Sequence, residues 1–153
     1  MLKRVVIADT SCLIVLTKID ALQFLKKLYQ EIFVTPEIVT EFGDELPEWI
    51  VVEEVSDKRF LQILNTSLDL GEASAIALAL EKKDSLLILD DLKGRREAEK
   101  LGLRITGTLG VLLKAKQQDV IKKIKPYIEK LKQRDFHISL QLEKEILELS
   151  GEK

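Results

Sequence analysis

Acidic residues follow two apolar segments of this sequence at the point where each segment ends. Asp9 directly follows the run Val5–Ala8, and the pair Asp90 and Asp91 directly follows the run Leu86–Leu89. Open parallel sheets bind ligands outside the carboxyl ends of their strands, so acids placed after two buried strands would face a binding edge. Clustered carboxylates repel one another there unless a cation or a proton relieves the repulsion.

Two glutamates extend this acidic set. Glu41 falls in the last turn of an expected helix, where the helix dipole disfavours a negative charge and where the residue has no capping task. Glu72 follows Asp69 by three residues, which is the spacing of a capping box in which Glu72 would reach back to the N–H of the cap. Asp9 and Asp91 could likewise cap the helices that follow them. Each acid alone has an ordinary structural explanation, but together they indicate a shared site.

The types of donor define the chemistry that such a site could perform. No cysteine or histidine cluster accompanies the acids, and oxygen ligands alone favour a hard divalent ion, Mg²⁺ or Mn²⁺. Helix N-termini at the same edge would supply N–H donors that suit a phosphate. The sequence therefore predicts metal-assisted phosphodiester chemistry. The expected ligands are Asp9, Glu41, Glu72 and Asp90 or Asp91, with hydroxyls nearby on Thr10, Ser11 and Thr108.

Strands and helices alternate along the chain in a pattern that would position these residues. Strands are expected at residues 4–9, 32–34, 49–55, 86–89 and 103–106. Helices are expected at residues 11–18 (capped by Thr10 or Ser11), 20–29 (capped by Asp20), 36–42, 57–65, a segment starting at Asp69, 92–101, 109–117, 119–125, 126–134 and 140–149. This alternation predicts an α/β fold with a parallel sheet covered on both faces. The last helix carries more apolar residues than a lone surface helix needs, so it should pack on the domain or on a second subunit.

Composition narrows the classes of protein further. A length of 153 residues suits one domain with a real core. The single cysteine, Cys12, cannot form an internal disulfide, which fits a reducing cytoplasm, and its apolar neighbours predict a buried core residue. No apolar run approaches the ~20 residues of a membrane span, and no signal peptide is expected. The net charge of −2 excludes a generally basic nucleic-acid binder, although residues 93–134 are rich in lysine and arginine and could contact phosphates. His137, the only histidine, is expected at the surface.

Five segments, in this order and over nearly the whole chain, resemble the PIN-domain nucleases. They are Ile7–Ile14, Thr35–Phe42, Leu70–Ala79, Leu87–Asp91 and Ile105–Leu112. The sequence is most similar to a prokaryotic subgroup that has a Gly-Thr-x-Gly-Val-Leu segment, here residues 107–112, and a helical tail. The resemblance implies a three-layer α/β/α fold with four or five parallel strands. It implies one PIN-like domain over residues 1–153, with a helical C-terminal tail at about 119–150.

The resemblance also assigns roles to the acids. Asp9, Glu41 and Glu72 match the first three metal-binding acids of the family, and Asp91 matches the fourth, with Asp90 as the alternative. In that family the four acids carry catalysis, Thr10 or Ser11 matches a hydroxyl beside the first acid, and Thr108 is a further contact.

The family resemblance implies a function and partners. The expected activity is Mg²⁺- or Mn²⁺-dependent endonucleolytic cleavage of single-stranded RNA in the cytoplasm. The chain would be the toxin of a toxin–antitoxin pair, would bind a small antitoxin protein and would form a homodimer. One alternative is a non-catalytic PIN-fold module that binds a regulatory partner, with its acids serving as caps. A phosphatase using Asp9 as nucleophile is disfavoured, because Ser11 stands where such enzymes carry a second aspartate.

Overall fold

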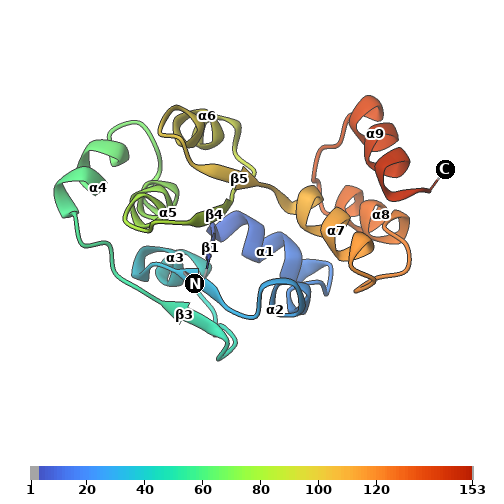
Figure 1. The fold of residues 1–153 in the computed structure, drawn as a ribbon, viewed down its shortest axis with the longest axis horizontal. Helices are drawn as coiled ribbons and strands as arrows, with labels where there is room; N and C mark the ends of the chain where they lie inside the picture. Colours follow the sequence, from blue (N-terminus) through green and yellow to red (C-terminus); the bar gives the residue numbers. More distant parts are fainter. Residues whose placement is uncertain (1–3, 153) are drawn as a thin grey trace.

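The computed structural model describes residues 4–152 of the chain (Figure 1). Its centre is a five-stranded, all-parallel sheet in the order β3-β2-β1-β4-β5. The middle strand pairs on both sides, with Ile7 opposite Phe33 of β2 and Leu87 of β4. The predicted α/β class with a parallel sheet of four to five strands is confirmed. The strands are β1 (Val5–Ala8), β2 (Ile32–Val34), β3 (Ile50–Val52), β4 (Ser85–Ile88) and β5 (Arg104–Thr106).

The strand order creates a switch point between β1 and β4. From β1 the chain adds β2 and β3 on one side, and it then returns to add β4 and β5 on the other side. Ligands of open α/β sheets bind at such a point, outside the carboxyl ends of the two strands. Asp9 directly follows β1, and Asp90 lies two residues after β4. The topology therefore places the two acidic strand ends side by side.

Helices pack on the sheet in two groups. Right-handed crossovers send the β1-to-β2 helices and the β3-to-β4 helices to opposite faces. In agreement, α1 and α2 contact α7, and α5 contacts α4 and α6, while α3 contacts both α1 and α5 (Figure 1). The helices are α1 (Thr10–Lys18), α2 (Gln23–Tyr29), α3 (Pro36–Phe42), α4 (Lys58–Asn65), α5 (Leu70–Leu80), α6 (Leu92–Lys100), α7 (Thr108–Gln117), α8 (Lys125–Gln133) and α9 (Leu140–Ser150). None of these described helices combines the length and the apolar character needed to cross a membrane.

Three aspartates end helices in a left-handed backbone conformation. Asp20, Asp119 and Asp135 have φ angles of 57°, 60° and 60°. After each one the chain closes the helix with a backbone hydrogen bond to a carbonyl five residues back, as in Ala21 N–H to Leu16 O at 2.8 Å. Aspartate tolerates this conformation better than most side chains do.

Two sequence predictions are wrong for this reason. Asp20 does not cap the second helix. It ends α1, and α2 begins only at Gln23. The helix expected at residues 119–125 does not form, because the chain turns at Asp119 after α7, and the turns that follow bury Ile121 and Ile124 before α8 begins at Lys125.

The helical tail packs on α7. Ile146 of α9 is 7% exposed and Leu147 packs against the core, whereas Leu140 and Leu149 remain exposed. The expected packing of this helix on the domain is therefore confirmed.

The Glu152 carboxylate fastens the end of the tail. It accepts hydrogen bonds from the N–H groups of Ile124 at 2.8 Å and Lys125 at 3.3 Å and from the Lys116 ammonium at 3.0 Å. Burial alone would raise the pKa of Glu152, but these donors outweigh it and lower the pKa below its ordinary value.

Replacing Glu152 should loosen this attachment. Glu152→Gln removes the charge that the three donors stabilise, and we expect the free energy of unfolding to fall by about 1–2 kcal/mol at pH 7. The folded-state pKa is lowered, so the contribution of the carboxylate is present above the unfolded pKa and lost as the pH falls through the folded pKa. Urea unfolding at pH 7 and pH 3 measures both effects. Glu148→Gln, on the exposed side of α9, is the matched control, and an equal loss in both variants would contradict the attachment.

Candidate active site

Asp9 occupies the first turn after β1 without capping the helix that follows. It stands at the N-cap position of α1, but its side chain makes no capping hydrogen bond. The residue is 2% exposed, and the Ser11 hydroxyl donates to its Oδ2 at 3.1 Å. Its Oδ1 is buried and has no hydrogen-bond partner in the described part of the chain. The expectation that Thr10 or Ser11 would cap α1 is wrong, because Asp9 holds that position.

Glu41 reaches the same edge from the last turn of α3. The Thr10 hydroxyl donates to its Oε1 at 2.7 Å. Its carboxylate lies against the backbone of Gly71, so closely that a Cβ at that position would collide with it. The buried hydroxyls of Thr35 and Ser74 hydrogen bond at 2.6 Å and fix the start of α3 against α5. The position of the Glu41 carboxylate therefore depends on the Thr10 hydroxyl of α1 and on the glycine at position 71 of α5.

Glu72 and Asp69 enter from the start of α5. The Glu72 N–H donates to the Asp69 side chain at 2.9 Å, which is one half of the predicted capping box. The Glu72 side chain turns inward, is 7% exposed and leaves its Oε2 without a hydrogen-bond partner among the described residues. A Cβ on Gly94 of α6 would lie 2.7 Å from this oxygen. A second glycine thus makes room for a second carboxyl group of the cluster.

Asp90 and Asp91 serve two different helices. Asp90 accepts the Thr108 N–H at 2.8 Å and the Thr108 hydroxyl at 2.5 Å, and it also accepts the Cys12 thiol at 3.2 Å. Asp91 caps α6 by accepting the Gly94 N–H at 3.0 Å, and it interacts with the Glu72 carboxyl. Cys12 is fully buried as the sequence predicted, and burial raises the pKa of its thiol. Of the two adjacent acids, Asp91 is thus the one that interacts with Glu72.

The acids of the site differ in their exposure to solvent. Asp9 and Glu72 are buried, whereas Glu41, Asp69 and Asp91 are exposed. Burial raises the pKa of Asp9 to about 6, against the hydrogen bonds from Thr10 and Ser11, and the charges of Asp69 and Glu41 add to the rise. Near neutral pH Asp9 is therefore largely ionised.

Glu72 has the larger shift. Burial raises its pKa to about 9, and the neighbouring carboxyls of Asp69 and Asp91 contribute through hydrogen bonds and charge. Near neutral pH Glu72 therefore keeps its proton, which lowers the repulsion within the cluster.

The structure thus gathers most of the residues that the sequence singled out. Asp9, Glu41, Glu72 and Asp91 meet at one edge with the Thr10 and Ser11 hydroxyls, while Asp90 and Thr108 bind each other beside them. Three further residues of this site were not predicted from the sequence. Asp69 was seen only as a cap, and Gly71 and Gly94 carried no assigned role. Their signal lay in the spacing, because Gly71 directly precedes Glu72 and Gly94 follows Asp91 by three residues.

The donors suit a hard cation, although they do not yet form a ligand set. Two buried carboxylate oxygens, Asp9 Oδ1 and Glu72 Oε2, lack a partner among the described residues, and an oxygen-only set suits Mg²⁺ or Mn²⁺. In their present arrangement, no group of three or more histidine, cysteine or acidic side chains within residues 4–152 could hold a metal ion. The chemistry of the donors fits such an ion, whereas their spacing is not that of a completed site.

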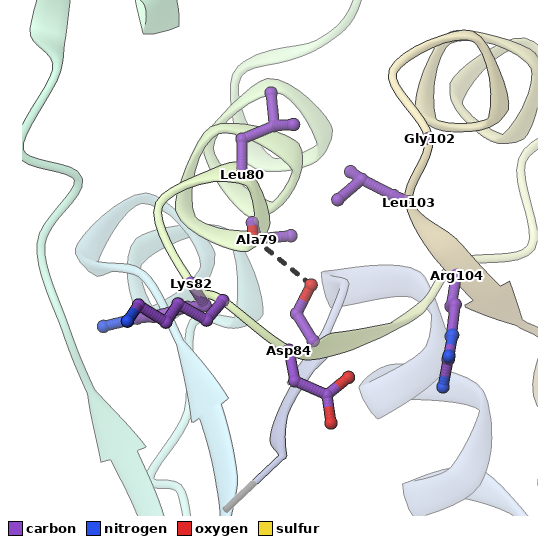
Figure 2. A pocket seen from close by; sticks show the side chains of 9 residues that line it. Ala79, Leu80, Lys82, Asp84, Gly102, Leu103 and Arg104 are labelled. Carbon is purple, nitrogen blue, oxygen red and sulfur yellow. Dashed lines mark hydrogen bonds between the residues drawn. The ribbon is translucent and has the colours of Figure 1, made fainter. Parts of the chain in front are cut away.

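A smaller cavity at the opposite edge of the sheet does not compete with this site. It measures about 250 Å³ and lies between the end of α5 and the starts of β4 and β5 (Figure 2). The Ser85 hydroxyl there donates to the Ala79 carbonyl at 3.2 Å. Lys82 pairs with Glu53, and Asp84 lies 3.5 Å from the Arg4 side chain. Two of its charged side chains are thus paired, and the cavity lies at the amino ends of β4 and β5, whereas the acids follow the carboxyl ends of β1 and β4.

The protein is thus of the α/β class, and its acidic site lies at the carboxyl ends of the parallel strands, where the strand order reverses. The chain belongs to the PIN-domain family, because a family model described as PIN domain matches residues 5–152. PIN domains are generally nucleases, and they typically use a divalent metal. No curated protein and no solved structure is similar enough to the chain to count as a match. The family resemblance seen in the sequence is confirmed.

Removing the buried charge of Asp9 should stabilise the metal-free protein at neutral pH. The pKa of Asp9 is about 6 in the folded state, against about 3.9 for an unfolded aspartate. The stability of the wild type therefore falls as the pH rises from about 4 to about 6. In EDTA, Asp9→Asn should raise the free energy of unfolding by about 1–3 kcal/mol at pH 8 and by little at pH 4. Urea unfolding at both pH values measures the difference. Asp119→Asn, at an exposed left-handed position, is the control, and a loss of stability in Asp9→Asn at pH 8 would count against a strained cluster.

The close approach of Glu41 to Gly71 can be tested by a double-mutant cycle. Alanine is otherwise favoured over glycine in a helix by up to about 1 kcal/mol. In the wild type, Gly71→Ala should show less than this gain, or a loss, because the added methyl displaces the Glu41 carboxylate. In a Glu41→Ala background the same change should stabilise, which gives a coupling energy of about 1 kcal/mol or more by urea unfolding. Additive effects would show that the two residues do not touch.

Proposed function

We propose that this protein is a metal-dependent endoribonuclease that cleaves single-stranded RNA. Membership of a family of nucleases supports the reaction class. The observation that carries the proposal is a pair of buried carboxyl oxygens at the switch point of the sheet, Asp9 Oδ1 and Glu72 Oε2, neither of which has a hydrogen-bond partner within residues 4–152. Burying such groups without a partner costs free energy. A fold retains that cost where a ligand relieves it, and here the ligand is a divalent cation with a phosphodiester beside it.

The residues that would hold Mg²⁺ or Mn²⁺ are Asp9, Glu41, Glu72 and Asp91, with Asp90 behind them. When bound, the ion would lower the pKa of a water molecule and offset charge on the scissile phosphate. The chain keeps the remaining parts in place. Thr10 orients the Glu41 carboxylate, and Ser11 orients that of Asp9.

Phosphate groups have further partners at this edge. Helices α1, α5 and α6 begin beside the acids, and their first N–H groups favour an anion. Lys93 and Arg96 of α6 are exposed, two and five residues after Asp91, and can contact the RNA backbone. An acidic centre flanked by cationic side chains and helix N-termini suits a phosphodiester better than it suits a neutral substrate.

We further propose that the protein acts in the cytoplasm as the toxin of a toxin–antitoxin pair, as a homodimer that a small antitoxin protein binds. Exposed leucines support a protein partner. Leu92 beside the acids and Leu140 on α9 are 61% and 85% exposed, and apolar residues of this kind are suited to an interface.

A second function deserves a direct test, that of a non-catalytic binding module. Asp69 and Asp91 do cap helices, as that alternative requires. It does not account for Asp9, whose side chain makes no capping hydrogen bond and whose buried Oδ1 has no partner in the part of the chain that the structure describes. The behaviour of Asp9 therefore separates the two functions.

Cleavage of RNA should depend on Asp9 and on metal. The wild type should cut a mixed-sequence single-stranded RNA in Mg²⁺ or Mn²⁺, and EDTA should stop the reaction. Asp9→Asn and Glu41→Gln should each lower the rate on the order of 100-fold or more, because each removes a ligand charge. Asp119→Asn should cut like the wild type. Undiminished cleavage by Asp9→Asn would remove Asp9 from the site, and a wild type that neither cuts RNA nor gains thermal stability from Mn²⁺ would favour the binding module.

A further inference from the structure

A larger cavity adjoins the acids and is closed on its outer side by the tail. It measures about 450 Å³, a size typical of small-molecule sites. Asp90 and Arg95 line the side nearest the acids, and Thr106 and Leu109 follow at the end of β5 and the start of α7. Phe136 and His137, in the segment between α8 and α9, form the opposite side. The cavity therefore lies between the acidic strand ends and residues that come late in the chain.

The tail segment presents two flat rings from a fixed backbone. Asp135 has a left-handed φ of 60°, and the Phe136 N–H then donates to the Leu131 carbonyl at 3.1 Å. Phe136 is half-buried and packs against the core, whereas His137 is exposed. Both side chains line the cavity, and aromatic rings in such a position can offer a face on which an unpaired base stacks.

The opposite wall supplies polar groups. The Arg95 guanidinium donates to the Leu89 carbonyl at 3.0 Å, and its other N–H groups make no hydrogen bond in the described structure. Asp90 is held by Thr108. Gly107 and Gly110 keep this wall open, because a Cβ on Gly107 would lie 2.5 Å from Asp90 Oδ1 and one on Gly110 would collide with the Thr106 hydroxyl.

We propose that this cavity binds one nucleobase of the RNA, next to the phosphate that lies over the acids. This inference rests on the proposed ribonuclease function. Aromatic and aliphatic walls suit the faces of a base, and an arginine with free donors suits its edge. Asp90 lines the cavity, and the next residue, Asp91, is one of the exposed acids of the site. A base in the cavity would therefore lie close to its own phosphate, which would lie over the acids. The tail is then part of the substrate site and contributes to base preference.

The single histidine gives a direct readout that does not require catalysis. His137 is the only histidine of the chain, so its ring signals in a ¹H–¹³C NMR spectrum are unambiguous. The full-length protein in EDTA at constant pH is titrated with AMP, with UMP and with ribose 5-phosphate. At least one nucleotide should shift the His137 signals in a saturable way, and ribose 5-phosphate should not.

Phe136→Leu supplies the matching variant. It should weaken nucleotide binding by about 5-fold or more, since stacking on one aromatic ring contributes roughly 1–3 kcal/mol per base. Phe60→Leu, a half-buried phenylalanine on α4, controls for the loss of an aromatic ring elsewhere. In cleavage assays Phe136→Leu should raise KM for RNA and change the preferred base, with kcat little affected.

The outcomes separate this inference from the function on which it rests. Cleavage by the wild type without any nucleotide-induced shift of His137 would overturn the base site and leave the ribonuclease standing. Saturable nucleotide binding without RNA cleavage would support the base site and count against the ribonuclease. A shift of equal size with ribose 5-phosphate would overturn base recognition in favour of phosphate binding.

Discussion

The acidic site depends on how closely carboxylates can approach one another in a buried place. Asp9 and Glu72 lie almost out of contact with solvent, and each keeps one oxygen without a partner among the described residues. Glu72 fits because Gly94 carries no side chain, and the neighbouring Glu41 fits because Gly71 carries none. Repulsion within the cluster is reduced by the proton that Glu72 keeps near neutral pH.

The fold sets this approach through a few contacts between helices. The strand order brings the ends of β1 and β4 together, so no long loop is required to join the acids. The Thr35 and Ser74 hydroxyls tie α3 to α5, and the Thr108 contacts of Asp90 tie α7 to the same edge. Since the tail packs on α7, its position is linked to the acidic edge through Asp90. The acidic site and the cavity beside it are therefore held in place by the same contacts between helices.

Much of the fold and of the acidic site could be predicted from the sequence, and each wrong prediction has a physical cause. Apolar runs of four residues identified the two central strands, β1 and β4, and the acids that follow these runs identified the edge. The sequence could not show that Asp20 and Asp119 adopt left-handed conformations, because aspartate is also a common helix cap. It could not show that Asp69 joins the site, since a capping box is satisfied locally. Nor could it choose between Asp90 and Asp91, because adjacent residues diverge only once α6 and α7 are placed in space.

If these carboxylates bind a cation as proposed, Glu72 should hold its proton until the cation binds. Calorimetric titration with Mn²⁺ at pH 7, in two buffers with different ionisation enthalpies, counts the protons released. With Glu72 at a pKa of about 9 and Asp9 at about 6, about one proton should leave per bound ion. Glu72→Gln should bind Mn²⁺ more weakly and release almost none. Absence of Mn²⁺ binding, or binding by the wild type without proton release, would contradict a cation site in which Glu72 starts protonated.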